Sequence, residues 1–465
     1  MSEPIYHDLS GDRVTLANDV AHSAWNDMLE AVMAHAATAP QCLARALGAD
    51  PGFALAHAVK GLMLLSLARA ELLGPARDCL ASARRAARLR PVTRREQMVI
   101  EALALWLDEA PRKAAERLEA ILLIHPHDAL ALKLSHGIRF MLGDQREMLA
   151  TLHRFAPGYD DSHPLAGYVA GCYAFALEER GFYADAERTG RRAVALSPRD
   201  AWGRHAVAHV LEMTGRTEEG IAWLADSRSI AHANNLRFHI FWHLALFRLE
   251  RGDVAEVLRL YDEEIRAEAT DDYRDIANAA SLLARLEHAG IAVGDRWEEL
   301  AAKAEGRVDD RRLVFADLHY VLSLLGAGHR DAAEGIARNL ARDALSGAGT
   351  ERSKAARSGA LAAQGLIAFA EGDNATAARL FGAARGGLLA IGGSHAQRDL
   401  FEQAHIEALM RAGDHELAAR LLEQRLSRRG GGNRFAARRL AQLRRHAPGR
   451  LAALAIAASP IALSH

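Results

Sequence analysis

Residues 167 to 200 read GYVAGCYAFALEERGFYADAERTGRRAVALSPRD. Two stretches with helical apolar periodicity flank Gly181, and Pro198 ends the second stretch. Glycine after a helix readily takes the left-handed conformation that turns the chain, and proline cannot continue a helix. Small residues such as Ala186 and Ala193 allow neighbouring helices to approach closely. The stretch therefore predicts a 34-residue helix hairpin that buries its apolar face by stacking on another hairpin.

The same punctuation recurs along the chain. Glycines that end an apolar-periodic stretch stand at Gly143, Gly181, Gly215, Gly252, Gly290, Gly328, Gly372 and Gly413. Successive members of this series are 34 to 44 residues apart. Helix-stopping prolines follow a matching interval at Pro51, Pro91, Pro126 and Pro198. This period is typical of tetratricopeptide repeats. We predict an all-α, tetratricopeptide-like helix-hairpin solenoid, a right-handed superhelix that stays a horseshoe or curls into a closed array.

Three regions follow from these signals. Residues 1–40 are expected to form an N-terminal cap with a helix from about Leu16 to Ala37, and residues 41–425 the solenoid. Residues 426–465 change character, because a basic, glycine-interrupted stretch is followed by the short apolar run LAALAIAASPIAL. That run is too short for a membrane anchor, so we expect a cap or tail against the last hairpin.

Charge and cysteine content limit the function classes. The 465 residues include 58 basic and 59 acidic side chains, so nucleic acid is not expected as a partner. Cys42, Cys79 and Cys172 are widely spaced and match no disulfide framework or zinc motif. Cysteines without a disulfide pattern are typical of the reducing cytoplasm, so we expect a cytoplasmic protein. No signal peptide or membrane-spanning run is evident, so neither export nor a membrane partner is expected.

Two histidine pairs fall on one helical face. His205 and His209 precede Gly215 by 10 and 6 residues, and His239 and His243 precede Gly252 by 13 and 9. Offsets that differ by three or four residues return to the same side of a helix. Measured in the same way, Ser281 and His319 hold the place of His243 on the next two hairpins.

First helices of such hairpins line the concave surface, so a histidine-lined groove is expected. Asn278 lies near this face and is expected to support it. The candidate catalytic residues are His205, His209, His239, His243, His319 and His395. The candidate ligand-binding residues are Trp202, Trp242, Ser281, Asp317, Arg398 and Asp399.

The two pairs carry the sharpest chemical hypothesis. Imidazoles at i,i+4 can ligate one ion, so His205, His209, His239 and His243 could complete four nitrogen ligands for zinc, copper or nickel. A divalent metal is the cofactor this pattern indicates. The runs HAVAH and HIFWH lack the glutamate of the H-E-x-x-H protease motif. The same imidazoles also suit acid/base catalysis, and histidines at helix contacts often have a purely structural role.

A second constellation reads IGGSHAQRDLFEQ at residues 391–403. Ser394 and Gln397 form the pattern of a capping box, which explains both residues structurally. His395 and Arg398 in the first turn favour capture of an anion at the helix N-terminus, unless Asp399 neutralises Arg398. If this helix curls over the groove, His395 and Arg398 would face the groove histidines.

Several long motifs resemble the family of tetratricopeptide repeat protein 38. They are AFALEERGFYADAE (174–187), DAWGRHAVAHVLEMTGRTEEGIAWL (200–224), FHIFWHLALFRLERG (238–252), SLLARLEHAGIAVGDRW (281–297), FADLHY (315–320) and GGSHAQRDLFEQ (392–403). The resemblance covers most of residues 90–405. It implies a helical repeat fold, a cytosolic protein and functional roles for the six candidate histidines. Ile240, Phe241 and Ala284 depart from the family pattern, which affects the shape of the pocket.

Two functions follow from the sequence. The first is a solenoid that binds a small molecule or a peptide in its histidine-lined groove. The second is an enzyme that uses the same histidines for acid/base or metal-dependent chemistry on a small polar substrate. No Ser nucleophile motif or nucleotide-binding loop distinguishes between them.

Overall fold

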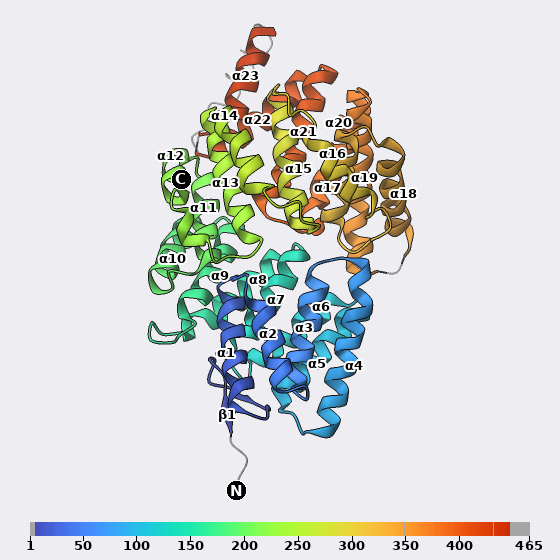
Figure 1. The fold of residues 1–465 in the computed structure, drawn as a ribbon. Coiled ribbons are helices and arrows are strands. Elements are labelled where there is room, and N and C mark those ends of the chain that lie inside the picture. Colours follow the sequence, from blue (N-terminus) through green and yellow to red (C-terminus); the bar gives the residue numbers. More distant parts are fainter. Residues whose placement is uncertain (1–4, 348, 431, 447–465) are drawn as a thin grey trace, which may run out of the picture.

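The computed structural model describes residues 5–347, 349–430 and 432–446 (Figure 1). Helices run through almost all of this part of the chain. The first group of elements comprises β1 (Tyr6–His7), β2 (Arg13–Val14), α1 (Asp19–Met33), α2 (Ala39–Ala49), α3 (Ala54–Ser66), α4 (Leu73–Leu89), α5 (Arg94–Leu107), α6 (Pro111–Leu122), α7 (Ala129–Met141) and α8 (Gln145–Phe155). The middle group comprises α9 (Ala166–Glu179), α10 (Tyr183–Leu196), α11 (Ala201–Met213), α12 (Thr217–Leu224), α13 (Leu236–Arg251), α14 (Val254–Leu260), α15 (Tyr273–His288) and α16 (Arg296–Glu305).

The last group comprises α17 (Val314–Gly326), α18 (Arg330–Leu345), α19 (Glu351–Ala370), α20 (Asn374–Ala384), α21 (His395–Ala412), α22 (His415–Arg428) and α23 (Arg434–His446). Short helical turns are η1 (Ala70–Leu72), η2 (Ala156–Gly158), η3 (Ser227–Ile230), η4 (Tyr261–Ile265) and η5 (Arg385–Ile391). The order of elements is that of an all-α solenoid of helix hairpins, as the sequence predicts.

The turn glycines behave as predicted. All eight members of the series from Gly143 to Gly413 have a positive φ, between 65° and 94°. At Gly252, for example, the backbone N–H donates to the carbonyl of Arg248 at the end of α13. Residues with a Cβ are strained in this conformation, so glycine sets the ends of these helices.

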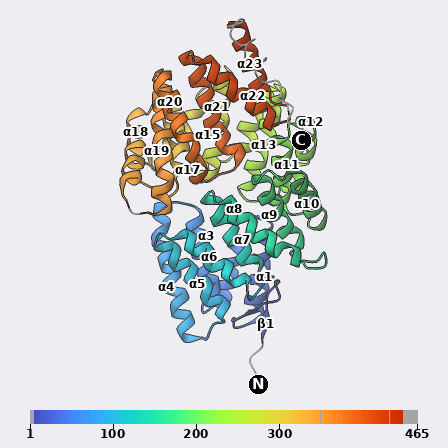
Figure 2. The same ribbon diagram turned by 180° about the vertical axis from the view of Figure 1, so that it is seen from behind.

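The described chain folds around two large apolar cores. One is built mainly from residues of β1 to α9, and the other mainly from residues of α11 to α23. Helix α11 contributes to both, since Ala206 belongs to the first core and Val207 to the second. Figures 1 and 2 show the first group of helices below and the later helices above, with α9 and α11 along the side where the two meet.

The later hairpins close on themselves. In both views, α15 and α21 lie between α11–α13 on one side and α18–α20 on the other (Figures 1 and 2). Arg285 on α15 donates to the carbonyl of Ala396 on α21 at 2.7 Å, and the backbone N–H of His395 donates to Glu179 on α9 at 2.8 Å. Helix α21 therefore occupies the inner side of the array.

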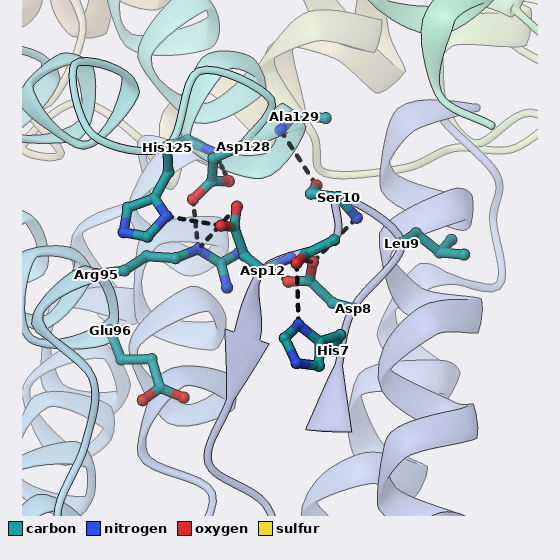
Figure 3. Close-up of polar contacts among 12 residues, drawn as sticks. His7, Asp8, Leu9, Ser10, Asp12, Arg95, Glu96, His125, Asp128 and Ala129 are labelled. Atoms are coloured by element: carbon teal, nitrogen blue, oxygen red, sulfur yellow. Dashed lines mark hydrogen bonds and ion pairs between the residues drawn. The ribbon is translucent and has the colours of Figure 1, made fainter. Parts of the chain in front are cut away.

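The N-terminal segment differs from the expectation of one helix from Leu16 to Ala37. Two short antiparallel strands precede α1, which begins only at Asp19. Asn18 caps α1 by accepting from the backbone N–H of Ala21. Figure 3 shows the surroundings of the strand turn, where the buried Arg95 pairs with Asp8 at 2.8 Å and with Asp128 at 2.6 Å. A buried guanidinium needs carboxylate partners, and the strand turn supplies one of them.

Both domain boundaries expected from the sequence fall inside helices. Residue 40 lies in α2 and residue 425 lies in α22. Part of the expected C-terminal tail is helical, because α23 extends to His446. The apolar run at residues 451–463 lies outside the described residues. Within the described part of the chain, every helix is too short or too polar to cross a bilayer.

Close helix packing gives a test of the fold. A Cβ placed on Gly220 in α12 would lie 2.3 Å from the ring of Phe247, whereas a Cβ on Gly137 in α7 would meet nothing within 4 Å. We expect Gly220→Ala to lower the free energy of unfolding by about 1–3 kcal/mol through overpacking. Gly137→Ala, the matched control, should raise it by about 0.5–1 kcal/mol, because alanine restricts the unfolded chain. Thermal unfolding of both variants measures the difference, and equal midpoints would contradict the packing.

Candidate metal centre

Two neighbouring helices present four histidines to one another. Helix α11 carries His205 and His209 one turn apart, and α13 carries His239 and His243 in the same way. The ring centroids of His205 and His239 are 4.8 Å apart, and those of His209 and His243 are 4.4 Å apart. The pairs therefore meet across the contact of the two helices, and we refer to them as the four-histidine centre.

The ring nitrogens of the four-histidine centre converge. Each ring offers one nitrogen, and these four nitrogens all lie within 4.8 Å of one another. The Nε2 atoms of His205 and His209 are 2.9 Å apart. A hydrogen bond between two imidazole nitrogens requires a proton on one of them, and a metal ion placed between the rings would replace that proton.

Acceptors outside the centre orient two of the rings. His239 Nδ1 donates to Asn278 Oδ1 at 2.7 Å, and His243 Nδ1 donates to Glu212 Oε2 at 3.0 Å. His209 Nδ1 lies 3.5 Å from Glu178 Oε2. A proton on Nδ1 leaves Nε2 with a free lone pair, which is the arrangement that metal-ligating histidines use.

Burial keeps these imidazoles neutral. The exposed fractions of His205, His209 and His243 are 2%, 0% and 0%. Burial lowers the pKa of all three well below the ordinary value, and neighbouring imidazoles lower it further. Burial also lowers the pKa of the more accessible His239, to about 4. Neutral imidazole is the form that ligates metals, whereas imidazolium would be needed to bind a carboxylate.

Several polar atoms at the centre lack partners. His243 Nε2 and His205 Nδ1 are buried without a hydrogen bond within the described residues, as are both carboxylate oxygens of Glu178. Buried polar groups are nearly always satisfied, so a cluster of exceptions calls for an ion or another bound group. The chemistry of the four nitrogens, with outer acceptors on two of the rings, suits a first-row transition metal ion.

Two glutamates at the end of α9 differ in their surroundings. Burial raises the pKa of Glu178 well above its ordinary value, and the nearby carboxylates of Glu179 and Glu212 raise it further. Glu179 instead accepts from the backbone N–H of His395 at 2.8 Å and from Arg398 at 3.3 Å. Together with His209, the two glutamates form a second cluster of side chains that could hold a metal ion.

The helix that begins at His395 lies against the same region. His395 Nε2 donates to the carbonyl of Glu179 at 2.7 Å, and Arg398 donates to the carbonyls of Gly392 and Gly393. The capping box of Ser394 and Gln397 is present. Asp399 pairs with Arg425 and not with Arg398. The Arg398 guanidinium is therefore used to hold the turn and Glu179.

The remaining candidates take part in helix packing and do not join the four-histidine centre. Trp202 packs against His205, with ring centroids 4.8 Å apart. Trp242 donates to Ser281 Oγ at 3.0 Å. His319 Nδ1 donates to the carbonyl of Phe315 at 2.7 Å.

Asp317 accepts from Arg352 at 2.9 Å. These contacts satisfy polar groups of neighbouring helices, which is a structural role.

The histidines do not line an open groove, which differs from the expectation. His319 is 1% exposed and packs against Phe401 of α21, with ring centroids 5.8 Å apart. Helix α21 packs against α11 and α15, and α23 packs against α13. The apolar inner side of α21 is buried only if it packs there, and this packing removes the groove from solvent.

Sequence reasoning missed Glu178 and Glu212. Both stand 3 residues before a turn glycine, Gly181 and Gly215. That offset is one further helical turn along the face that carries the histidines. Extending the same register by one turn would have identified both carboxylates.

Known proteins add information on the fold. No protein-family model matches the chain. The human IFIT1 dimer with m7Gppp-AAAA is similar with a TM-score of 0.41 and 14% sequence identity, over 93% of this chain and 96% of that chain. Naa15/Naa10 bound to HypK-THB is similar with a TM-score of 0.25 and 12% identity, over 92% of this chain and 67% of that chain. Likeness at this level carries no ligand or activity to this chain.

One expectation is corrected by these comparisons. The exclusion of nucleic acid, which was drawn from the balanced net charge, is wrong, because the similar helical structures include one with the nucleic acid m7Gppp-AAAA. Net charge is a sum over the whole chain, so it does not reveal local patches of positive charge that could bind nucleic acid.

Neutral burial of the histidines makes stability depend on pH. The pKa of His239 is about 4 in the folded chain and near 6.5 in the unfolded chain, so the unfolded chain binds more protons between these values. The contribution is complete above about pH 6.5 and is lost as the pH falls toward about 4. We expect the thermal midpoint of metal-free protein to fall over this range.

A double variant, His239→Gln with His243→Gln, should show a shallower fall, and His415→Gln at the start of α22 serves as the control. Identical pH profiles for the double variant and the control would contradict neutral burial of the centre.

Proposed function

We propose that this protein is a helical-repeat metalloprotein whose four-histidine centre binds one divalent transition metal ion. The observation that carries the proposal is the convergence of four neutral imidazoles, three of them buried, with nitrogens within 4.8 Å of one another. Asn278 and Glu212 support it, because each accepts from the outer nitrogen of a ligand ring. A histidine cluster with a purely structural role would satisfy its buried nitrogens, and this cluster leaves several without partners.

The donor set narrows the choice of metal. Four imidazole nitrogens suit zinc, copper and nickel, whereas calcium and magnesium prefer oxygen ligands. Nitrogen donors from two rigid helices also fix the geometry. We therefore expect zinc, copper or nickel and no tight binding of calcium or magnesium.

Metal content tests the proposal directly. Protein without a histidine tag should contain about one equivalent of transition metal by elemental analysis, and the double variant His209→Ala with His243→Ala should contain none. His319→Gln is a matched control, because His319 is equally buried but bonds to a backbone carbonyl.

Addition of a chelator is expected to lower the thermal midpoint of the wild-type protein and of His319→Gln, and to leave that of the double variant unchanged. A metal-free wild-type protein that also fails to bind added zinc, copper or nickel would overturn the proposal.

The outer carboxylate gives a finer test. Glu212 Oε2 holds His243 in the tautomer that exposes Nε2, and glutamine offers a weaker acceptor in the same place. We expect Glu212→Gln to reduce metal affinity by about 10–100-fold, with the stoichiometry unchanged. Competition titration against a chromogenic chelator measures the change. Glu218→Gln on the exposed face of α12 should leave the affinity as it is.

Metal-dependent catalysis is a second candidate, and Glu178 favours it. Its carboxyl is buried beside His209, and burial raises its pKa, which favours the protonated form that could pass a proton to a reacting group. A bound ion would supply Lewis acidity at such a site. Four protein ligands without a solvent position are, however, typical of structural ions. The absorption spectrum of cobalt-substituted protein separates the two, since tetrahedral cobalt absorbs far more strongly than five-coordinate cobalt.

Three further proposals concern the family, the cellular compartment and the limits of the solenoid. The long motifs support kinship with the family of tetratricopeptide repeat protein 38. The three buried cysteines Cys42, Cys79 and Cys172 are free thiols, which supports a reducing compartment such as the cytoplasm. We place the limits of the solenoid at the ends of helices, from Ala39 at the start of α2 to Arg428 at the end of α22, with the N-terminal and C-terminal segments as caps.

A further inference from the structure

An arginine-rich pocket lies where the C-terminal helices cross the ends of α11, α13 and α15. Its volume is ≈ 100 Å³. Six of the described residues that line it are arginines: Arg285, Arg425, Arg429, Arg434, Arg438 and Arg439. Its acidic lining residues are Glu212, Glu250 and Asp399. We refer to this site as the arginine pocket.

Three of the arginines are buried around one carboxylate. Arg425 Nη2 lies 2.7 Å from Asp399 Oδ2, Arg429 Nη2 lies 3.2 Å from Asp399 Oδ1, and Arg285 Nη2 lies 3.9 Å from Asp399 Oδ2. Their side chains are 3%, 8% and 4% exposed. Buried charges are normally paired, and Asp399 alone cannot balance the charge of three guanidinium groups.

The other acidic groups only partly offset this charge. Burial raises the pKa of Glu250 to about 7, so a substantial fraction of this carboxyl is protonated near neutral pH. Glu212 Oε1 lies 3.5 Å from Arg429 Nη1. Burial lowers the pKa of Arg285 to about 10, and the positive charges of Arg425 and Arg429 also lower it. The carboxylates of Asp399 and Glu212 act in the opposite direction and raise this pKa. The lining thus holds six arginines against three acidic residues, and Arg439 also pairs with Glu407.

Two further arginines stand at the open side of the pocket. Arg434 and Arg438 are exposed residues of α23, one turn apart on the face that lines the pocket. The Arg434 guanidinium donates to the carbonyl of Arg251 at 2.6 Å, which directs it across the end of α13. Guanidinium groups from three helices thus surround one small space.

We propose that the arginine pocket binds the phosphoryl group of a small molecule. Several guanidinium groups around a confined volume match the charge and the several acceptor oxygens of a phosphate dianion. A volume of ≈ 100 Å³ suits one phosphoryl group with the remainder of the molecule directed outward. This site is separate from the four-histidine centre, and the proposal does not depend on the metal.

Glu212 connects the two sites. Its Oε1 faces Arg429 in the arginine pocket and its Oε2 accepts from His243 in the four-histidine centre. An anion that attracts Arg429 would leave Glu212 more strongly associated with His243. Glu212 is therefore the residue through which the two sites are in contact.

Binding of inorganic phosphate and of glycerol 3-phosphate by the full-length protein tests this site. Isothermal titration at constant ionic strength, with chloride as reference, should show saturable binding of both probes. A tighter complex with glycerol 3-phosphate would identify a phosphate monoester as the source, and equal affinities would identify free phosphate. The double variant Arg434→Gln with Arg438→Gln should bind at least about tenfold more weakly.

Arg445→Gln, an exposed position of the same helix outside the pocket lining, is the matched control and should bind as the wild-type protein does. Circular dichroism checks that both variants keep the wild-type helix content and thermal midpoint. The proposal is overturned if neither probe binds above the chloride reference, or if the double variant retains wild-type affinity. Binding of a single-stranded oligonucleotide without binding of either small probe would also overturn it. Because these titrations need no metal, their failure would leave the four-histidine centre unaffected.

Discussion

The contact between α11 and α13 is the interaction on which the rest of the structure depends. Helix α11 belongs to both apolar cores, so it joins the N-terminal hairpins to the C-terminal ones. Its contact with α13 buries four imidazoles, and burial of polar groups costs free energy unless partners compensate. Asn278 and Glu212 compensate two of them. The remaining unsatisfied nitrogens lower the stability of this helix pair, and a bound ion would raise it.

Closure of the array gives the centre its chemical character. In an open solenoid, histidines of the first helices would face water and titrate near neutral pH. Here α21 packs over the inner side, and its first turn bonds to Glu179 at the end of α9. Exclusion of water lowers the pKa of the histidines and raises that of Glu178. The same fold that could present a peptide groove therefore encloses a site suited to an ion.

The C-terminal helices complete the molecule in a second way. They bring Arg425 and Arg429 to Asp399 and extend the positive surface through α23. These residues are distant in sequence from Glu212, which lies between the arginine pocket and the four-histidine centre. The two proposed sites thus share one carboxylate, Glu212.

The sequence by itself determined the hairpin architecture and the register of the histidines. Turn glycines such as Gly181 and Gly252 act locally, because a positive φ ends a helix whatever surrounds it. Spacings of three and four residues likewise place His205 and His209 on one face without reference to other helices.

Only the tertiary structure decided how the ends of the array meet. Burial of the inner face, the partners of Glu178 and the pairing of Arg95 with Asp8 all depend on segments far apart in the chain. Local periodicity describes which face of a helix is apolar or polar, but packing decides what covers that face. The chemistry of the histidines follows from that covering, since desolvation sets their protonation.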